Sequence, residues 1–220
     1  MKKCIFWIML FCAQISSGQN IVLSGGSHTV QNNDKRLYKV TSGSGGQFLG
    51  EIEIVGPLTD PVAAFNNFYK KSKILGANAY VPVSNPDLEG KEIATNLHKL
   101  HLYYFEQLPV QNNIAFILNP GKARKFRING NKVELPADSF YTLELQDGKE
   151  ISVATGGFLG STVSLTYKLC QPAVFLTLNS GGLGTSHDPN NGGIIIKSGD
   201  LVQLESSFGA FFTLFYTHEN

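Results

Sequence analysis

The chain has 220 residues, and its 18 basic and 17 acidic side chains give a formal net charge of +1. Because the two signs are interspersed, the composition argues against a nucleic-acid partner and against an anionic membrane surface, both of which require clustered Lys and Arg. A length of about 200 residues is enough to bury one or two hydrophobic cores.

The first 18 residues have the pattern of a secretory signal peptide. Two lysines precede an apolar run from Cys4 to Ile15, and small residues follow at positions 16–18. This run is shorter than the roughly 20 apolar residues that span a bilayer, so no transmembrane segment is expected in the mature chain. We expect cleavage before Gln19 and export to the periplasm, the cell surface or the medium.

A competing interpretation of this start is lipidation of Cys12. A bacterial lipobox has a small residue directly before the cysteine, whereas Phe11 is bulky. Removal of residues 1–18 leaves Cys170 as the single cysteine, so no intramolecular disulfide is possible and the core must stabilise the fold.

An α+β module is predicted over residues 19–107. It begins with a strand over residues 48–55, where alternation places Phe48 on the same face as Ile52 and Ile54, with Leu49 on the opposite face. Glu51 and Glu53 also lie on that opposite face, and they are interpreted as solvent-facing charges that protect a sheet edge.

A helix is predicted directly after this strand. Asp60 is a suitable N-cap, Pro61 fits the first turn and Gly76 ends the helix. Apolar residues at Phe65, Phe68 and Leu75 recur at helical spacing and are expected to pack on the sheet. Two strands follow, over residues 79–83 and 96–106, which completes a unit of strand, helix, strand and strand.

A domain boundary is predicted at residues 108–113, and a β-sandwich over residues 113–220. Turn signals recur every eight to twelve residues, for example Asn129 with Gly130 and Asp147 with Gly148. They separate candidate strands at 114–118, 123–128, 132–135, 140–145, 151–154, 163–169, 174–178, 194–197, 201–204 and 211–217. The last of these is apolar on both faces and is therefore expected to be central in a sheet.

Histidine spacing offers one candidate metal site. His98 and His101 would share one face of a helix, but they lie in a strand pattern, where residues three apart point to opposite faces. We therefore interpret them as structural or surface histidines.

A candidate hydrolase site would combine His187 and Asp188 with Cys170. Ser186, His187 and Asp188 are adjacent within the loop 181–193, whereas the members of a catalytic triad converge from separate elements. Cys170 has ordinary flanking residues, and a lone cysteine most often behaves as a small buried hydrophobe. The sequence thus predicts no catalytic residue, no metal and no cofactor.

Two further clusters have structural and functional interpretations. Tyr103, Tyr104 and Phe105 could stack on a sugar or peptide, but core packing explains them as well. The basic residues between 122 and 127 span a predicted strand edge, where charges protect against aggregation more often than they bind a ligand.

The strings Leu-Gly-Glu at 49–51 and Leu-Gly-Ala-Asn at 75–78, with an aromatic helix between them, resemble a module of small bacterial envelope proteins. That family includes the stress-sensing outer-membrane lipoprotein of the Rcs phosphorelay. The resemblance covers roughly a quarter of the chain and implies an α+β fold. This chain lacks the structural cysteines and the lipobox of the sensor.

A second resemblance concerns the C-terminal half. Asn129, Gly130 and Leu135, the strand over 140–145 and Gly148 resemble a pattern of carboxypeptidase-regulatory and PEGA-like sandwiches, which are generally non-catalytic. Together with the signal peptide, this combination is similar to exported proteins of the Bacteroidetes group.

The expected function is therefore that of a non-enzymatic exported envelope protein that binds a protein or a glycan. One alternative is an envelope-stress sensor, which would expose an apolar patch on its first module. The other is a hydrolase, which requires that Cys170, His187 and Asp188 meet in one pocket.

Overall fold

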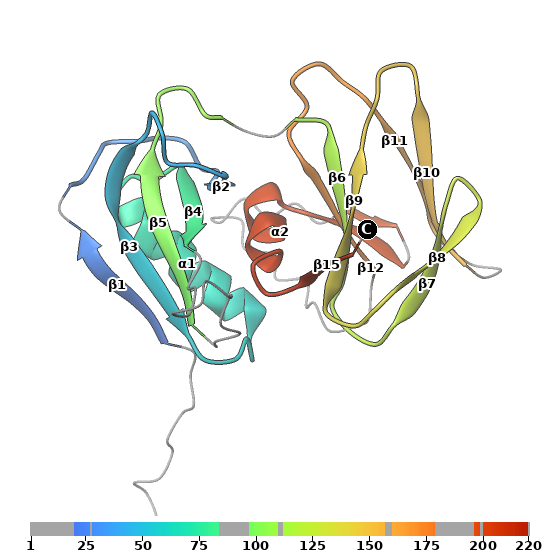
Figure 1. Ribbon diagram of the computed structural model, residues 1–220, viewed down its shortest axis with the longest axis horizontal. Helices are drawn as coiled ribbons and strands as arrows, with labels where there is room; N and C mark the ends of the chain where they lie inside the picture. Colours follow the sequence, from blue (N-terminus) through green and yellow to red (C-terminus); the bar gives the residue numbers. More distant parts are fainter. Residues whose placement is uncertain are drawn as a thin grey trace, which may run out of the picture.

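The computed structural model describes residues 20–26, 28–83, 97–109, 112–156, 160–178, 196–198 and 200–219. These residues form three open β-sheets and two short helices (Figure 1). The five-stranded sheet lies at one end of the molecule, and the four- and six-stranded sheets lie at the other. The predicted signal peptide and the loop 181–193 lie outside the described residues.

The five-stranded sheet has the order β1-β3-β5-β4-β2, and its neighbouring strands are antiparallel except for the parallel pair β4 and β2. The strands are β1 (Asn20–Gly26), β2 (Tyr38–Lys39), β3 (Gln47–Val55), β4 (Ala79–Val83) and β5 (Leu97–Tyr104). The order β3, helix, β4, β5 along the chain agrees with the sequence prediction, whereas β1 and β2 are additional strands.

The helix α1 (Pro61–Ile74) confirms the predicted helix and its cap. Asp60 Oδ1 accepts a hydrogen bond from the backbone N–H of Ala63 at 3.0 Å. Phe65 and Phe68 are buried in a core that α1 shares with β3 and β5. Gly76 follows the helix with a φ of +80°, and a Cβ there would lie 1.8 Å from the carbonyl oxygen of Val30.

The faces of β3 differ from the prediction near its start. A β-bulge between Phe48 and Gly50 shifts the register against β5 by one residue. Leu49 therefore joins Ile52 and Ile54 in the core, while Phe48 is 43% exposed on the opposite face. Strict alternation fails here because one extra residue reverses the direction of every side chain before it.

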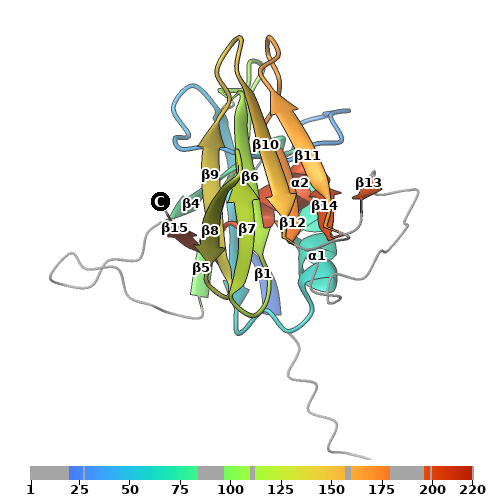
Figure 2. The ribbon, with the colours of Figure 1, turned by 90° about the vertical axis from the view of Figure 1, so that its right-hand side faces the viewer.

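The C-terminal half contains two sheets that face each other across a shared core (Figure 2). Their orders are β11-β10-β7-β8 and β13-β14-β12-β6-β9-β15. The strands are β6 (Ile114–Asn119), β7 (Arg124–Ile128), β8 (Asn131–Leu135), β9 (Ser139–Glu144), β10 (Glu150–Thr155), β11 (Thr162–Thr166), β12 (Val174–Leu178), β13 (Ile196–Ser198), β14 (Leu201–Leu204) and β15 (Thr217–Glu219). Nine of the ten strands share two residues or more with a predicted one. The exception, β15, shares only Thr217 with the strand predicted over residues 211–217.

The strand predicted over residues 211–217 is wrong in its main part. Residues 206–212 form the helix α2 (Ser206–Phe212), and Glu205 caps it by accepting a hydrogen bond from the backbone N–H of Phe208 at 3.0 Å. Phe208, Phe211, Phe212 and Phe215 recur at the three- and four-residue spacing of a helix. The β-propensity of the aromatic residues obscured this period.

The helix α2 lies between the two ends of the molecule and contributes to the cores of both (Figure 1). Phe211 belongs to the core of the five-stranded sheet, where its ring centroid is 5.2 Å from that of Phe68. Phe212 belongs to a separate core on the six-stranded sheet, with Phe140 and Phe175. The chain thus crosses the region of the predicted boundary at residues 108–113 and later returns to the first half through α2.

Candidate functional site

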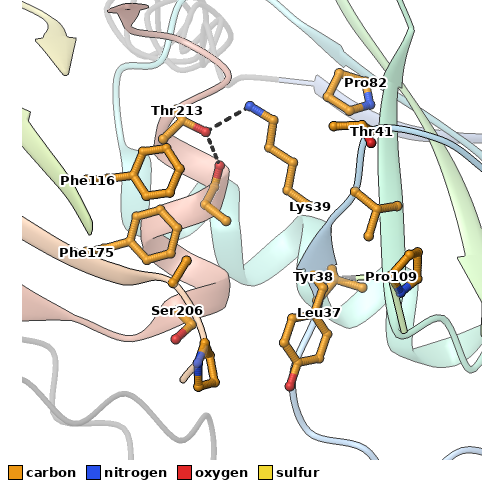
Figure 3. Close-up of a pocket in the computed structure, with 14 residues that line it drawn as sticks. Leu37, Tyr38, Lys39, Thr41, Pro82, Pro109, Phe116, Phe175, Ser206 and Thr213 are labelled. Atoms are coloured by element: carbon orange, nitrogen blue, oxygen red, sulfur yellow. Dashed lines mark hydrogen bonds between the residues drawn. The ribbon is translucent and has the colours of Figure 1, made fainter. Parts of the chain in front are cut away.

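A cavity of about 390 Å³ lies between the two halves of the molecule (Figure 3). One wall comes from β2, β4 and the segment after β5, and the other comes from β6, β12 and α2. The lining residues are Leu37, Tyr38, Lys39, Val40, Thr41, Pro82, Pro109, Phe116, Pro172, Ala173, Phe175, Ser206, Ala210 and Thr213. Most of these side chains are apolar, so the cavity is a mainly hydrophobic space with a few polar groups.

The side chain of Lys39 extends across the cavity from β2 toward α2 (Figure 3). Its Nζ donates a hydrogen bond to Thr213 Oγ1 at 2.9 Å, and Thr213 Oγ1 donates to the carbonyl oxygen of Ala210 at 2.8 Å. Desolvation by the surrounding protein lowers the pKa of Lys39 to about 8. Lys39 as a whole residue is nevertheless exposed, so water screens part of this desolvation and the lowering of its pKa is an upper bound.

Lys39 has no acidic partner among the described residues. The described carboxylates within ion-pair distance of a basic group pair with Lys99, His101 or Lys125. Apart from Lys39 itself, Tyr38 is the one titratable side chain among those that line the cavity. The site therefore presents a single cation beside apolar surface and a few hydroxyl groups.

Two stacked phenylalanines form the apolar wall opposite β2. The rings of Phe116, from β6, and Phe175, from β12, have centroids 4.8 Å apart and an interplanar angle of 7°. The helix α2 packs tightly on Phe175, since a Cβ at Gly209 would lie 2.3 Å from its Cγ. Close packing against the helix leaves the Phe175 ring little freedom to reorient.

His98 and His101 lie on opposite faces of β5, as the strand pattern predicts. His98 is packed against Phe215, with ring centroids 4.6 Å apart, and partial burial lowers its pKa. His101 Nε2 lies 3.0 Å from Glu51 Oε2 on the other face. One metal ion therefore cannot bind both rings.

The hydrolase interpretation rests largely on residues beyond the described part of the chain. His187 and Asp188 lie there, and only Cys170 can be placed. Cys170 is exposed and has a φ of +57° in a turn after β11, so the expectation of a small buried hydrophobe is wrong. The N–H of Gln171 donates to the carbonyl oxygen of Lys168 at 3.0 Å and closes this turn.

The two edge-protection interpretations are also wrong, because the strands concerned are interior. β7 lies between β10 and β8, and it carries Arg124, Lys125 and Arg127 of the basic cluster. β3 lies between β1 and β5, and its two glutamates form cross-strand ion pairs. Lys99 Nζ lies 2.8 Å from Glu53 Oε1 and 3.6 Å from Glu51 Oε1. These charges complement one another across the sheet.

The aromatic residues 103–105, at the end of β5 and just after it, are divided between the core and the surface. Phe105 is buried, and Tyr104 packs against the core of the five-stranded sheet. Tyr103 instead meets exposed Phe48, with ring centroids 5.7 Å apart, and Phe48 also meets His101 at 5.3 Å. Phe48, His101 and Tyr103 form a small aromatic cluster on the face of the sheet opposite α1, which we call the outer cluster.

The residues that line the cavity have no distinctive local pattern in the sequence. Lys39 belongs to a two-residue strand, which is too short for any periodicity. Phe116 and Phe175 resemble ordinary strand residues. A signal was present in the continuous apolar run of residues 114–118, because a strand that is apolar on both faces must be covered on both.

The motif residues of the first resemblance have structural roles. A Cβ at Gly50 would lie 2.6 Å from the carbonyl oxygen of Gly25, so the neighbouring strand requires a glycine there. Asn78 is buried, donates to the carbonyl oxygen of Phe105 at 2.7 Å and accepts from its N–H at 2.9 Å. These contacts explain the motif without assigning it a ligand.

Comparison of the chain with protein-family models, with curated proteins and with solved structures found no match. Within the described part of the chain, neither helix has the length and apolar character needed to cross a membrane. The functional argument therefore depends on the geometry of the cavity.

Proposed function

We propose that this chain is an exported, non-enzymatic binding protein whose ligand occupies the cavity beside Lys39. In this proposal the first half is an α+β module, the second half is a β-sandwich, and each provides one wall of the site. The chain would work in the periplasm, at the cell surface or in the medium, because the start of the sequence has the pattern of a signal peptide.

The observation that supports this function is the cavity itself. A volume of about 390 Å³ lies within the range of small-molecule sites, and such sites combine apolar walls with a few polar groups. The walls come from both halves and from α2, so the cavity depends on the assembled fold. A small apolar ligand would fill space that the side chains leave open.

A dye-binding experiment with a cavity-filling variant tests this function. Anilinonaphthalene sulfonate, an apolar anionic dye, is titrated into the mature protein and its fluorescence is followed. Ala173 lines the cavity, so we expect Ala173→Phe to weaken dye binding at least tenfold. Ala123→Phe is the matched control, because Ala123 is exposed outside the cavity.

Equal dye affinity in wild type and Ala173→Phe would contradict the proposed site. So would an absence of saturable binding to the wild-type protein. Circular dichroism and the thermal midpoint of both variants establish that each is folded when it is compared.

The outer cluster supports a second candidate function, which is contact with an envelope protein or glycan. The face of the five-stranded sheet that carries the outer cluster exposes three large hydrophobic residues, Val22, Phe48 and Val55. An exposed aromatic ring such as that of Phe48 can stack on a sugar. An envelope-stress sensor would use this face for a signalling partner.

Crosslinking and pull-down from the native envelope test the second candidate. We expect Phe48→Ser to lose a partner that wild type and Ala173→Phe both retain. Retention of the same partner by Phe48→Ser would exclude the outer cluster as the contact.

A further inference from the structure

We propose that the ligand of the cavity is a small monocarboxylate with an apolar body, and that its carboxylate pairs with the ammonium group of Lys39. This inference rests on the proposed function, because it assigns a chemical class to the ligand of that same cavity. It follows from the charge, the hydrogen bonds and the shape of the lining.

The charge of the site favours an anion. Lys39 is the single cationic side chain among the described residues that line the cavity, and no described carboxylate lies within ion-pair distance of it. A partly desolvated ammonium group without a counter-charge raises the free energy of the folded protein. An anionic ligand restores the missing interaction, which a neutral ligand cannot do.

The hydrogen bonds around Lys39 favour a carboxylate. An ammonium group has three N–H donors, and Nζ of Lys39 directs one of them to Thr213 Oγ1 at 2.9 Å. Among the described residues no other group accepts from Nζ, so two donors remain for the two oxygens of a carboxylate. The Thr213 hydroxyl does not donate to the carboxylate itself, because its hydrogen is donated to the carbonyl oxygen of Ala210.

A single positive charge selects a monoanion. Sites for phosphate and other dianions usually combine an arginine or several lysines with backbone N–H groups. The described lining contains no arginine and no second lysine, so a second negative charge on the ligand would remain unpaired in an apolar space. Phosphates and dicarboxylates are therefore poor ligands for this site.

The apolar body of the ligand is inferred from the remaining walls. Phe116 and Phe175 form one side, and prolines 82, 109 and 172 contribute further rigid apolar surface to the lining. Figure 3 shows Lys39 between the two phenylalanines on one side and Pro82 and Pro109 on the other. A ligand of matching shape thus has its charged group at Lys39 and its hydrocarbon against the phenylalanines.

The pKa of about 8 for Lys39 gives the site a pH dependence. The other side chains that line the cavity with Lys39 come from β2, β4, β6, β12, α2 and the segments after β5 and before β12, and among the described ones only Tyr38 is an ionisable type. The ammonium group is therefore charged at pH 7 and loses its proton as the pH passes 8. Carboxylate affinity is expected to be nearly constant between about pH 6 and 7, where the ligand is ionised, and to fall up to tenfold per pH unit above 8.

Calorimetric titration of the mature protein with matched ligands tests the inference. Phenylbutyrate is compared with phenylbutyramide, and decanoate with decanamide, so that each pair differs in charge and not in its apolar body. We expect at least one carboxylate to bind wild type about tenfold or more tightly than its amide, which is the scale of a charge-assisted hydrogen bond. The same preference is expected in Lys70→Met, because Lys70 is an exposed lysine of α1.

Variants of Lys39 provide the decisive comparison. Lys39→Met should lose the preference for the carboxylate, which then binds no more tightly than the amide because its charge is unpaired in the cavity. Lys39→Gln, which keeps a donor but no charge, should lose the preference as well. If the amides and carboxylates bind wild type equally, the inference is overturned while the proposed binding function stands. If neither class binds and the dye also fails to bind, both are overturned.

Discussion

Lys39 and Lys73 lie in different surroundings, although desolvation lowers the pKa of each to about 8. Lys73 Nζ donates to three backbone carbonyl oxygens, those of Asp34 at 2.8 Å, Arg36 at 2.5 Å and Ala77 at 2.9 Å. Lys39 Nζ donates to the Thr213 hydroxyl alone among the described residues. The two lysines show that a lowered pKa does not by itself mark a binding site.

The difference lies in the unused donors and in the space beside them. All three N–H groups of Lys73 are engaged: two connect α1 to the segment before β2 and the third binds the carbonyl oxygen of Ala77 just after α1, which is a structural task. Lys39 has two donors without an acceptor in the described part of the chain, and it faces a cavity of about 390 Å³. We therefore assign Lys73 to stability and Lys39 to ligand binding, and the predictions below test this division.

The largest expected effect concerns the helix that forms the wall of the cavity next to Lys39. Phe211 is completely buried and packs against Phe65 and Phe68, so Phe211→Ala should lower the free energy of unfolding by about 3–5 kcal/mol. Phe48→Ala, at an exposed ring, should cost less than about 1 kcal/mol. Denaturant titration measures both. A small loss in Phe211→Ala would mean that α2 does not hold the two halves together.

The next largest effect is the difference between the two lysines in how much each stabilises the fold. Lys73→Met leaves three carbonyl oxygens without their donor and should lower the free energy of unfolding by about 1–3 kcal/mol. Lys39→Met removes one hydrogen bond and a partly desolvated charge, so its effect should stay within about 1 kcal/mol. Equal losses of unfolding free energy in the two variants would contradict the assignment of Lys73, and not Lys39, to stability.

A third effect separates the two lysines by reactivity. At pH 8, an acylating reagent should modify Lys39 several-fold faster than Lys73, because both amines are partly neutral but only Lys39 faces an open cavity. Mass spectrometry of peptides after brief labelling measures the two rates. Lys70 supplies the reference rate of an exposed lysine. Faster labelling of Lys73 than of Lys39 would contradict the division of roles.

The smallest effect is the pH dependence of stability. The pKa of Lys39 is about 8 in the folded chain, against an ordinary value of 10.5, so the unfolded chain binds more protons between these two values. The stability of wild type relative to Lys39→Met should therefore rise from pH 8 to pH 10. Subtraction of the Lys39→Met stability curve removes the contributions of the tyrosines and the other lysines to the pH dependence. A flat difference would show that Lys39 titrates at its ordinary pKa.

The elements with clear local signals were predictable from the sequence. The cap at Asp60 and the spacing of Phe65 and Phe68 identify α1, and the Asn129-Gly130 pair identifies the hairpin of β7 and β8. Both turn residues have positive φ, of 51° and 82°. These signals suffice because they depend on residues that are neighbours along the chain.

The cavity was not predictable, because it depends on contacts between distant segments. Its walls meet only when α2 returns to the first half, and α2 was interpreted as a strand. Leu37 N–H donates to Ser207 Oγ at 2.9 Å, a contact that joins residues 170 positions apart. Lys39 and Thr213 are a similar pair, and no local pattern relates them.

The measurement that most directly tests the central claim is the NMR titration of the Lys39 ammonium group, with Lys39→Met used for assignment. Without ligand, the pKa should be near 8. Saturation with a bound carboxylate such as phenylbutyrate should raise it by about one unit or more, because a nearby negative charge stabilises the protonated amine. A bound carboxylate that leaves the pKa of Lys39 unchanged would contradict the assignment of this residue to the ligand.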